Sequence, residues 1–477
     1  MKVLFVYRFE HIEALGIMQL SSMLKLHGHD VDFIDLKFER DVPRAVREIG
    51  PDILAYSVTT GMHRLYEKLN RELKSEFDVF SVFGGPHCTY FPEFIESNGV
   101  DAICVGEGEH ALPELVDALQ EGADVTSIPN IWVKAGNTVH RNDVRPLLED
   151  LDSLPFPDRE LCCKYNHYRR MHTRYLLTGR GCPFVCTFCY NPAFNRLYRG
   201  KGKIVRRRSV GNVIEELRRI RDRFNTERFC FHDDTFSRDR RWVLDFCEAY
   251  GREIGVPFDV SVRANVLSEE LVIALKRAGC TVAAYSVESG NERIRQTILK
   301  KKVETEDLVK AGRMIRAHGL KLTLQNMLGL PDETLEMAYE TLRLNIRIRP
   351  SYGWASIYRP FPRTEAYEYS KRKGYLREES ELPARYFAGH SLNTKDSARI
   401  ERLHHLFSVG VQWPFLVPLI RLLVHLPLTE LYRMVWLVHK AHYYLFRARQ
   451  MRPYELFIRE RRSNRREGAC SLRSRSS

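Results

Sequence analysis

Three cysteines lie close together near the middle of the 477-residue sequence. They are Cys182, Cys186 and Cys189, in a C-x3-C-x2-C run that follows the apolar segment 175–178, with Phe188 directly before the last cysteine. Three such thiolates with no fourth nearby can hold three irons of a 4Fe-4S cluster and leave the fourth iron open for chemistry. Structural zinc is the alternative, but it requires four closed ligands, usually as two C-x2-C pairs or with histidine. The spacing therefore favours the cluster.

This cysteine spacing resembles the signature of radical S-adenosylmethionine (radical SAM) enzymes. The resemblance implies that an electron donor such as flavodoxin or ferredoxin reduces the cluster. The reduced cluster then cleaves S-adenosylmethionine to a 5'-deoxyadenosyl radical, which removes hydrogen from an unactivated carbon. It also implies that residues 171–375, where apolar strands alternate with helical stretches, form a partial (β/α)6 barrel of the TIM type. The chemistry of such barrels takes place at the carboxyl ends of the strands.

The family's S-adenosylmethionine contacts can be carried over to residues at these strand ends. Asp233 or Asp234, after the second strand, would meet the methionyl amine, because a carboxylate pairs with an ammonium group. Arg263, after the third, would hold the carboxylate in a bidentate fork. The resemblance implies that Glu288 binds the ribose, and the full set of expected contacts is Phe188, Asp233, Asp234, Arg263, Glu288, Met327 and Gly329.

Each of these contacts has a structural alternative. An aspartate after a strand can cap the following helix, Arg263 can be a surface cation, and Glu288 can belong to an ion-pair network. The adenine strand also departs from the family's G-x-I-x-G-x-P-x-E-T pattern, because Gln325 replaces the first glycine. No residue can be assigned from the sequence as a catalytic acid or base.

Residues 1–140 also alternate short apolar runs with amphipathic helical stretches, which predicts a doubly wound, Rossmann-like α/β domain with a parallel sheet. The ligand site of such a sheet lies at the carboxyl ends of its strands. Glycines and hydroxyls follow the third, fourth and fifth expected strands, and glycine lets a ligand approach the backbone closely. Ahead of a radical SAM core, this order resembles a cobalamin-binding domain, with expected contacts at Ser57, Thr59, Gly84, Gly85 and Gly106.

The segment after the first strand departs from the cobalamin-domain motif. Domains that ligate cobalt carry D-x-H-x-x-G there, whereas here His11 precedes Gly16 by five residues rather than three. We interpret His11 as a loop or helix-start residue rather than a cobalt ligand, so we predict a cobalt without a protein histidine beneath it.

Two further segments complete the predicted organisation. Residues 131–141 read as a hairpin, and residues 141–170 are expected to be a linker, because Leu154-Pro155-Phe156-Pro157-Asp158 is punctuated by proline. Residues 376–477 fall outside the resemblance and are expected to form a mostly helical accessory region with a basic tail. Residues 447–477 carry ten arginines, no lysine and three glutamates, within a net charge of +13 for the whole chain.

The apolar stretch 407–438 is interrupted by prolines and charges, so we do not expect it to span a membrane. An amphipathic element on a membrane surface or beside a greasy substrate fits the pattern, as does a packing helix. The tail would contact anionic lipid or be a solvated end. Nucleic acid is not expected as a partner. The sequence starts with a strand pattern rather than a secretion signal, so the expected location is the cytoplasm, including the inner face of its membrane.

The leading functional interpretation is a cobalamin-dependent radical SAM enzyme with three cofactors: a 4Fe-4S cluster, S-adenosylmethionine and cobalamin. We predict a methyltransferase that acts on an unactivated carbon of a small-molecule or lipid-like substrate. A cyclase or rearranging enzyme without net methyl transfer is the alternative within the family. A non-enzymatic iron-sulfur or cobalamin sensor is the alternative outside it, although a sensor has no need of the S-adenosylmethionine contacts.

Overall fold

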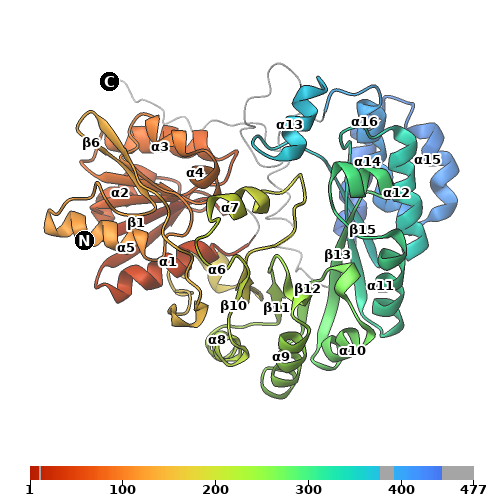
Figure 1. Ribbon diagram of the computed structural model, residues 1–477, viewed down its shortest axis with the longest axis horizontal. Coiled ribbons are helices and arrows are strands. Elements are labelled where there is room, and N and C mark those ends of the chain that lie inside the picture. Colours follow the sequence, from red (N-terminus) through yellow and green to blue (C-terminus); the bar gives the residue numbers. More distant parts are fainter. Residues whose placement is uncertain (10–11, 377–391, 443–477) are drawn as a thin grey trace.

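The computed structural model describes residues 1–9, 12–376 and 392–442. Two α/β units lie side by side, with the C-terminal helices packed on the far side of the second (Figure 1). This is the predicted order of a doubly wound domain, a partial barrel and a helical C-terminal region. His11 and the basic tail from Arg447 onward lie outside the described residues.

The first unit is built on a seven-stranded sheet in the order β2-β1-β3-β4-β5-β6-β7. Its first five strands are parallel, and β6 and β7 form the predicted hairpin, antiparallel to β5. Strand β1 has four consecutive buried residues, which is typical of a strand covered on both faces by helices. The strands are β1 (Lys2–Tyr7), β2 (Asp30–Asp35), β3 (Ile53–Ser57), β4 (Phe80–Gly84), β5 (Ala102–Cys104), β6 (Ile131–Ala135) and β7 (Thr138–Arg141). The helices are α1 (Leu15–Leu26), α2 (Val42–Ile49), α3 (His63–Lys74), α4 (Pro86–Tyr90) and α5 (Ala111–Glu121).

The second unit has a six-stranded sheet in which the strands follow one another in chain order. All of its pairings are parallel, so the carboxyl ends of the strands share one edge. The strands are β8 (Thr173–Leu176), β11 (Arg228–Phe231), β12 (Phe258–Ser261), β13 (Cys280–Glu288), β14 (Lys321–Leu328) and β15 (Tyr352–Ile357). The helices between them are α8 (Val210–Arg223), α9 (Arg240–Glu253), α10 (Glu269–Arg277), α11 (Thr305–Ala317) and α12 (Leu335–Ile348). Four of the helices begin at a side chain that accepts a backbone N–H, which fixes where each starts: Ser209, Asp239, Ser268 and Thr334.

The segment between the two sheets packs closely against the first unit. Val144 and Leu147 belong to one face of its core, and Tyr168 of the short helix α6 (Asn166–Arg169) belongs to the other. A buried ionic network joins the units, because Arg159 of this segment contacts Glu13 at 2.9 Å and Glu216 of α8 at 3.0 Å. The 141–170 segment therefore fixes the two units against each other.

The C-terminal helices cover β15 and α12. Helix α14 (Ser397–Gln412) packs there through Leu403 and Phe407, so this part of the apolar stretch is a packing helix. It is preceded by α13 (Glu365–Arg372) and followed by α15 (Val417–Leu423) and α16 (Thr429–His442). No helix among the described residues is long and apolar enough to cross a bilayer.

Candidate active site

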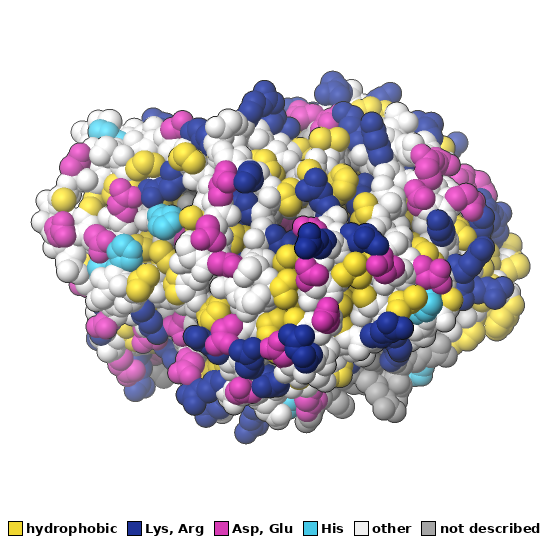
Figure 2. Space-filling model, turned by 60° about the horizontal axis from the view of Figure 1, so that its bottom comes forward, with side chains coloured by type: hydrophobic (Ala, Val, Ile, Leu, Met, Phe, Trp, Pro, Cys, Tyr) yellow, Lys and Arg dark blue, Asp and Glu magenta, His cyan; other side chains and the backbone are white. Residues whose placement is uncertain are grey.

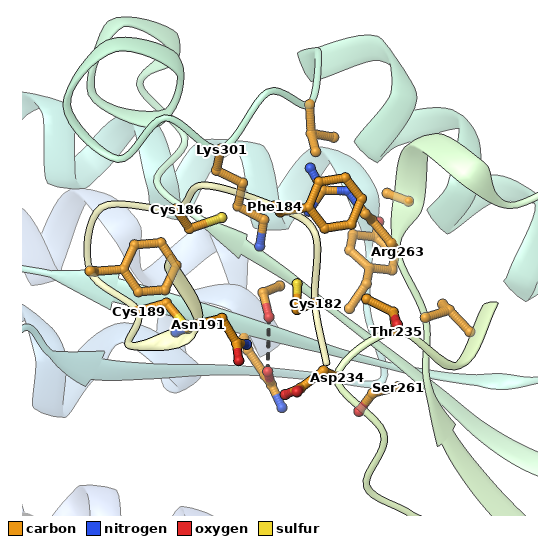
Figure 3. A pocket seen from close by; sticks show the side chains of 17 residues that line it. Cys182, Phe184, Cys186, Cys189, Asn191, Asp234, Thr235, Ser261, Arg263 and Lys301 are labelled. Atoms are coloured by element: carbon orange, nitrogen blue, oxygen red, sulfur yellow. Dashed lines mark hydrogen bonds between the residues drawn. The ribbon is translucent and has the colours of Figure 1, made fainter. Parts of the chain in front are cut away.

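A cavity of about 210 Å³ opens at the carboxyl edge of the second sheet. All three predicted cluster ligands, Cys182, Cys186 and Cys189, line it (Figure 3). Of the expected S-adenosylmethionine contacts, Phe188, Asp234 and Arg263 also line it. Side chains from four strands, the cysteine loop and the segment that holds Lys301 therefore converge on one space, as the predicted barrel requires.

The cysteine loop is held in place from both sides. Gly179 and Arg180 form the short strand β9, which pairs with β10 (Arg206–Arg207). A Cβ on Gly181, whose φ is +87°, would lie 2.0 Å from the carbonyl oxygen of Ile204, so only glycine permits this approach. Farther along, the N–H of Thr187 donates to the carbonyl of Leu299 at 3.0 Å.

The three thiols fit a cluster better than a single metal ion. Among the described residues, no three His, Cys, Asp or Glu side chains are close enough together to hold one metal ion. The three cysteines instead line the cavity together with noncysteine side chains such as Asp234 and Arg263 (Figure 3). Burial raises the pKa of all three thiols, that of Cys189 to about 11, so loading iron must release protons from them.

The two aspartates after β11 have different surroundings. Asp233 is buried and accepts from the N–H and the hydroxyl of Thr178, at 3.0 and 2.7 Å, at the start of the cysteine loop. Asp234 instead lines the cavity, where desolvation raises its pKa and Asn191 is its hydrogen-bond partner. Asp234 is therefore the aspartate that is placed to meet an ammonium group, and Asp233 shapes the loop.

Arg263 lies directly over the ring of Phe184 in the cysteine loop, 3.5 Å from the ring centroid. Its guanidinium also donates to the side chain of Asn265 at 2.9 Å and partly offsets the rise that burial causes in the pKa of the Cys186 thiol. The stacking on Phe184 gives the cation a fixed place at the cavity wall. A bidentate contact with a carboxylate is compatible with this position.

Glu288 does not line the cavity. Its ion-pair partner Lys301 does, and the sequence analysis did not predict that residue. The carboxylate of Glu288 is buried and accepts from Lys301 at 2.9 Å. Lys301 lines the cavity, and its amino group points into the space beside Cys186 (Figure 3). The only sequence signal is the Lys300-Lys301-Lys302 run, which cannot be told from a solvated charge run without the fold.

Strand β14, which the resemblance implies is the adenine strand, has some of these residues at the cavity and others packed away from it. Gln325, the departure from the family pattern, lines the cavity and accepts from Ser286 at 2.9 Å. Met327 packs against a small hydrophobic cluster that includes Leu330 and Tyr358, as Phe188 also does. Gly329 follows β14 with φ +76°, and its N–H donates to the buried carboxyl group of Glu333 at 2.5 Å.

In the first unit, the expected cobalamin contacts do lie where strands β3, β4 and β5 end. At two of the glycines, however, the chain itself occupies the space that a side chain would take. A Cβ on Gly85 would lie 3.0 Å from the backbone nitrogen of Val58, and one on Gly106 would lie 1.9 Å from the hydroxyl of Tyr198. Tyr198 follows α7 (Asn191–Leu197) in the second unit, so the missing side chain of Gly106 lets the two units pack closely here.

The same edge meets the cysteine loop at a second place. Tyr90 of α4 stacks on Tyr190, the residue after Cys189, with ring centroids 4.3 Å apart and planes 9° apart. Near it, His63 and His87 stack at 4.2 Å as a buried pair that the sequence analysis did not single out. The carboxyl edge of the first sheet and the cluster cavity of the second therefore face a common region.

Comparison with known proteins agrees with this geometry. The Radical SAM superfamily matches residues 176–344, and the B12 binding domain matches residues 1–116. An uncharacterised methyltransferase of Pyrococcus horikoshii is 30% identical over 368 residues, which cover 75% of this chain and 78% of that protein. The chain belongs to the radical SAM superfamily, with a B12-binding domain in front.

Two more proteins are similar to this chain. The anaerobic magnesium-protoporphyrin IX monomethyl ester cyclase of Rubrivivax gelatinosus is 26% identical and covers 77% of this chain and 70% of its own. The fold is similar to the structure of the radical SAM methyltransferase TsrM from Kitasatospora setae, with a TM-score of 0.67 at 19% identity. That alignment covers 80% of this chain and 79% of TsrM. The predicted cofactors, a 4Fe-4S cluster, S-adenosylmethionine and cobalamin, are those of this superfamily and domain.

Proposed function

We propose that this radical SAM protein is a methyltransferase that acts on an unactivated carbon. The observation that supports it is the meeting of the two carboxyl edges: Arg180 of the cysteine loop contacts Glu109 after β5 at 2.6 Å, and Tyr190 stacks on Tyr90. Methyl transfer requires the substrate radical and the methyl donor in one cavity, held at near-contact distance. This chain places the cluster loop and the edge of the B12-binding domain against each other.

The chain's own residues hold and orient the reactants. When bound, the cluster and S-adenosylmethionine supply the 5'-deoxyadenosyl radical, and cobalamin supplies the methyl group. The three cysteines would hold the cluster, Asp234 would pair with the methionyl ammonium, and the cations Arg263 and Lys301 would face the carboxylate. Phe184 and Phe188 both line the cavity and would exclude water from the reacting carbon.

The test is the stoichiometry of the cosubstrate products. A methyltransferase consumes two molecules of S-adenosylmethionine per product, one released as 5'-deoxyadenosine and one as S-adenosylhomocysteine. Assays with methyl-deuterated cosubstrate should place deuterium in the product, and Asp234→Ala should lower both cosubstrate products together. A cyclase would release 5'-deoxyadenosine without matching S-adenosylhomocysteine, and unlabelled product would overturn the methyltransferase proposal.

The partners we propose are a small flavodoxin- or ferredoxin-type electron donor and a small-molecule or lipid-like substrate. The expected contact with the membrane surface is supported by an exposed apolar face on α15, α16 and the turns beside them. Phe415, Leu422 and Val438 are 76%, 70% and 69% exposed, and Figure 2 shows hydrophobic side chains gathered beside Lys and Arg at this end of the molecule. Exposed apolar patches of this kind mark interaction sites.

Anionic lipid fits this face because Arg421, Arg433 and Lys440 lie on the same helices. Sedimentation with vesicles of acidic lipid should recover the protein, and recovery should fall as salt rises, because exposed charges are screened beyond about 8 Å at physiological ionic strength. Leu422→Glu together with Val438→Glu should abolish recovery, whereas Leu26→Glu, at an exposed leucine on α1, should not. Equal recovery with neutral vesicles would overturn the electrostatic part.

A further inference from the structure

The segment between the last cysteine and α8 belongs in part to the first unit. The hydroxyl of Tyr198 accepts the N–H of Glu107 at 3.0 Å and the side-chain amide of Asn130 at 3.3 Å. Lys201 donates to the carbonyl of Val144 at 2.7 Å. Phe194, Leu197 and Ile204 pack against the core of the first unit. Residues 191–206, which we call the connector, are therefore anchored on the B12-binding domain.

Two arginines extend this anchorage to the cysteine loop. Arg206, at the end of the connector, holds both carboxylate oxygens of Glu107 at 2.7 and 2.9 Å, and its side chain is only 1% exposed. Arg180, two residues before Cys182, contacts Glu107 at 3.1 Å and Glu109 at 2.6 Å. The arginines keep the pKa of the Glu107 carboxyl below its usual range, so both contacts are charge-assisted.

The two arginines are also partners in one backbone ladder. Arg180 of β9 pairs with Arg206 of β10, and both neighbouring glycines are packed against the connector. A Cβ on Gly179 would lie 2.7 Å from the carbonyl oxygen of Arg206, and one on Gly181 would lie 2.0 Å from that of Ile204. The start of the cysteine loop is therefore packed against the connector, which Glu107 holds, and Arg180 adds a direct tie from the loop to Glu107 and Glu109.

We propose that Arg180 is a positioning residue that sets the separation between the iron-sulfur cluster and cobalamin. It ties the start of the cysteine loop to Glu107 and Glu109, which lie one and three residues after Gly106 at the carboxyl edge of the B12-binding domain. The proposal rests on the two cofactors of the family and not on methyl transfer. It holds equally for a cyclase, so the two can fail separately.

Replacing Arg180 should remove its own contacts with Glu107 and Glu109 and leave the contacts of the connector in place. Glu107 keeps its two contacts with Arg206, whereas Glu109 loses its 2.6 Å contact, so the fold should persist while the cysteine loop gains freedom. A misplacement of about 1 Å between reacting groups can cost a hundredfold in rate. We expect Arg180→Gln to cleave S-adenosylmethionine at nearly the normal rate but to lower the yield of final product per 5'-deoxyadenosine by roughly tenfold or more.

The decisive measurement does not depend on turnover. In protein loaded with both cofactors, pulsed electron paramagnetic resonance of the reduced cluster and cob(II)alamin gives the distribution of distances between them. Arg180→Gln should broaden that distribution, and Arg180→Lys should restore it in part. Lys201→Gln is the matched control, because Lys201 anchors the connector but not the cysteine loop.

Glu109→Gln tests the same tie from the other unit and avoids any change near the cysteines. It should broaden the distribution as Arg180→Gln does, with iron content and melting temperature close to those of the unchanged protein. Distributions in Glu109→Gln as narrow as in the unchanged protein would overturn the proposal. Equal broadening in Lys201→Gln would also overturn it, because any weakened contact between the units would then have the same effect.

Discussion

The two halves of the candidate active site are built in different ways. In the radical SAM half, side chains such as Cys189, Asp234 and Arg263 point into one cavity, and each has a chemical group that a ligand needs. In the B12-binding half, the positions expected to matter are glycines and hydroxyls at strand ends. Two of those glycines are packed against the protein's own atoms, Gly85 against Val58 and Gly106 against Tyr198.

This difference shows what a glycine motif can and cannot indicate. A cysteine or aspartate in a cavity has few purposes, so its type already restricts its role. A glycine reports only that something approaches the backbone closely, and that neighbour can be a cofactor or another part of the chain. Substitutions in the two halves should therefore act through different properties: chemistry in the radical SAM half, and packing between the units in the other.

The largest effect is expected at the cysteines. Replacing Cys182, Cys186 and Cys189 by Ala should abolish the iron-sulfur absorbance and cosubstrate cleavage completely, because the cluster loses all of its protein ligands. Replacing the buried Cys247 and Cys280 by Ala is the control and should leave the absorbance intact. Iron that remains bound in the triple variant would show that the cluster lies elsewhere.

The two aspartates after β11 provide the next test. Asp234→Ala should lower cosubstrate cleavage roughly tenfold to a hundredfold, because a contact with a charged group contributes about 1.5–3 kcal/mol. Asp233→Ala leaves the N–H of Thr178 without its acceptor, so its main effect should be a loss of about 1–3 kcal/mol in the free energy of unfolding. Cosubstrate affinity by calorimetry and unfolding by urea separate the two. A loss of cosubstrate affinity in Asp233→Ala, with a loss of stability in Asp234→Ala, would instead show that Asp233 is the ligand.

How far the sequence predicts this site follows from the same distinction. The cysteine spacing and the strand ends identified Cys186, Asp234 and Arg263, because both features are local in the chain. Lys301 was missed because it reaches the cavity only when the turn after β13 folds back on the cysteine loop, through the bond from Thr187 to Leu299.

The parallel sheets could be predicted for a similar reason. Buried parallel strands appear as continuous apolar runs, and their order follows from right-handed crossovers. The contact of Gly106 with Tyr198 joins positions far apart in the chain and leaves no pattern in the sequence. Nothing local distinguishes such a glycine from one that contacts a ligand.

A smaller effect is expected at Gly106 itself. Gly106→Ala would place a Cβ 1.9 Å from the hydroxyl of Tyr198, and overpacking of this kind typically costs about 1–3 kcal/mol. If the glycine serves this packing, the loss should shrink when Tyr198 is also replaced by Ala, in a double-mutant cycle of unfolding free energies. Cobalamin affinity that falls equally with and without Tyr198 would instead show that Gly106 contacts the cofactor.

The most local effects are expected from pH, and they should have opposite signs in the two halves. Burial lowers the pKa of His63 to about 4 and of His87 to about 3, so both are neutral in the folded B12-binding domain. The unfolded chain takes up these protons near pH 6.5, so their stabilising contribution is present above that pH and is lost as pH falls toward 4.

Burial raises the pKa of Glu333 in the radical SAM half to about 8, so its carboxyl stays protonated when folded. The unfolded chain releases this proton near pH 4.5, so stability falls as pH rises from there toward 8. Hydrogen exchange should therefore quicken around His63 and His87 in acid and around β14 in base. His87→Phe should reduce the acid response, because only His63 then contributes to it, and Glu333→Gln should remove the basic response. Exchange that quickens in both halves at the same pH, and persists in both variants, would mean that other groups set the pH dependence. In that case the burial of these three side chains would not explain how the stability of each half depends on pH.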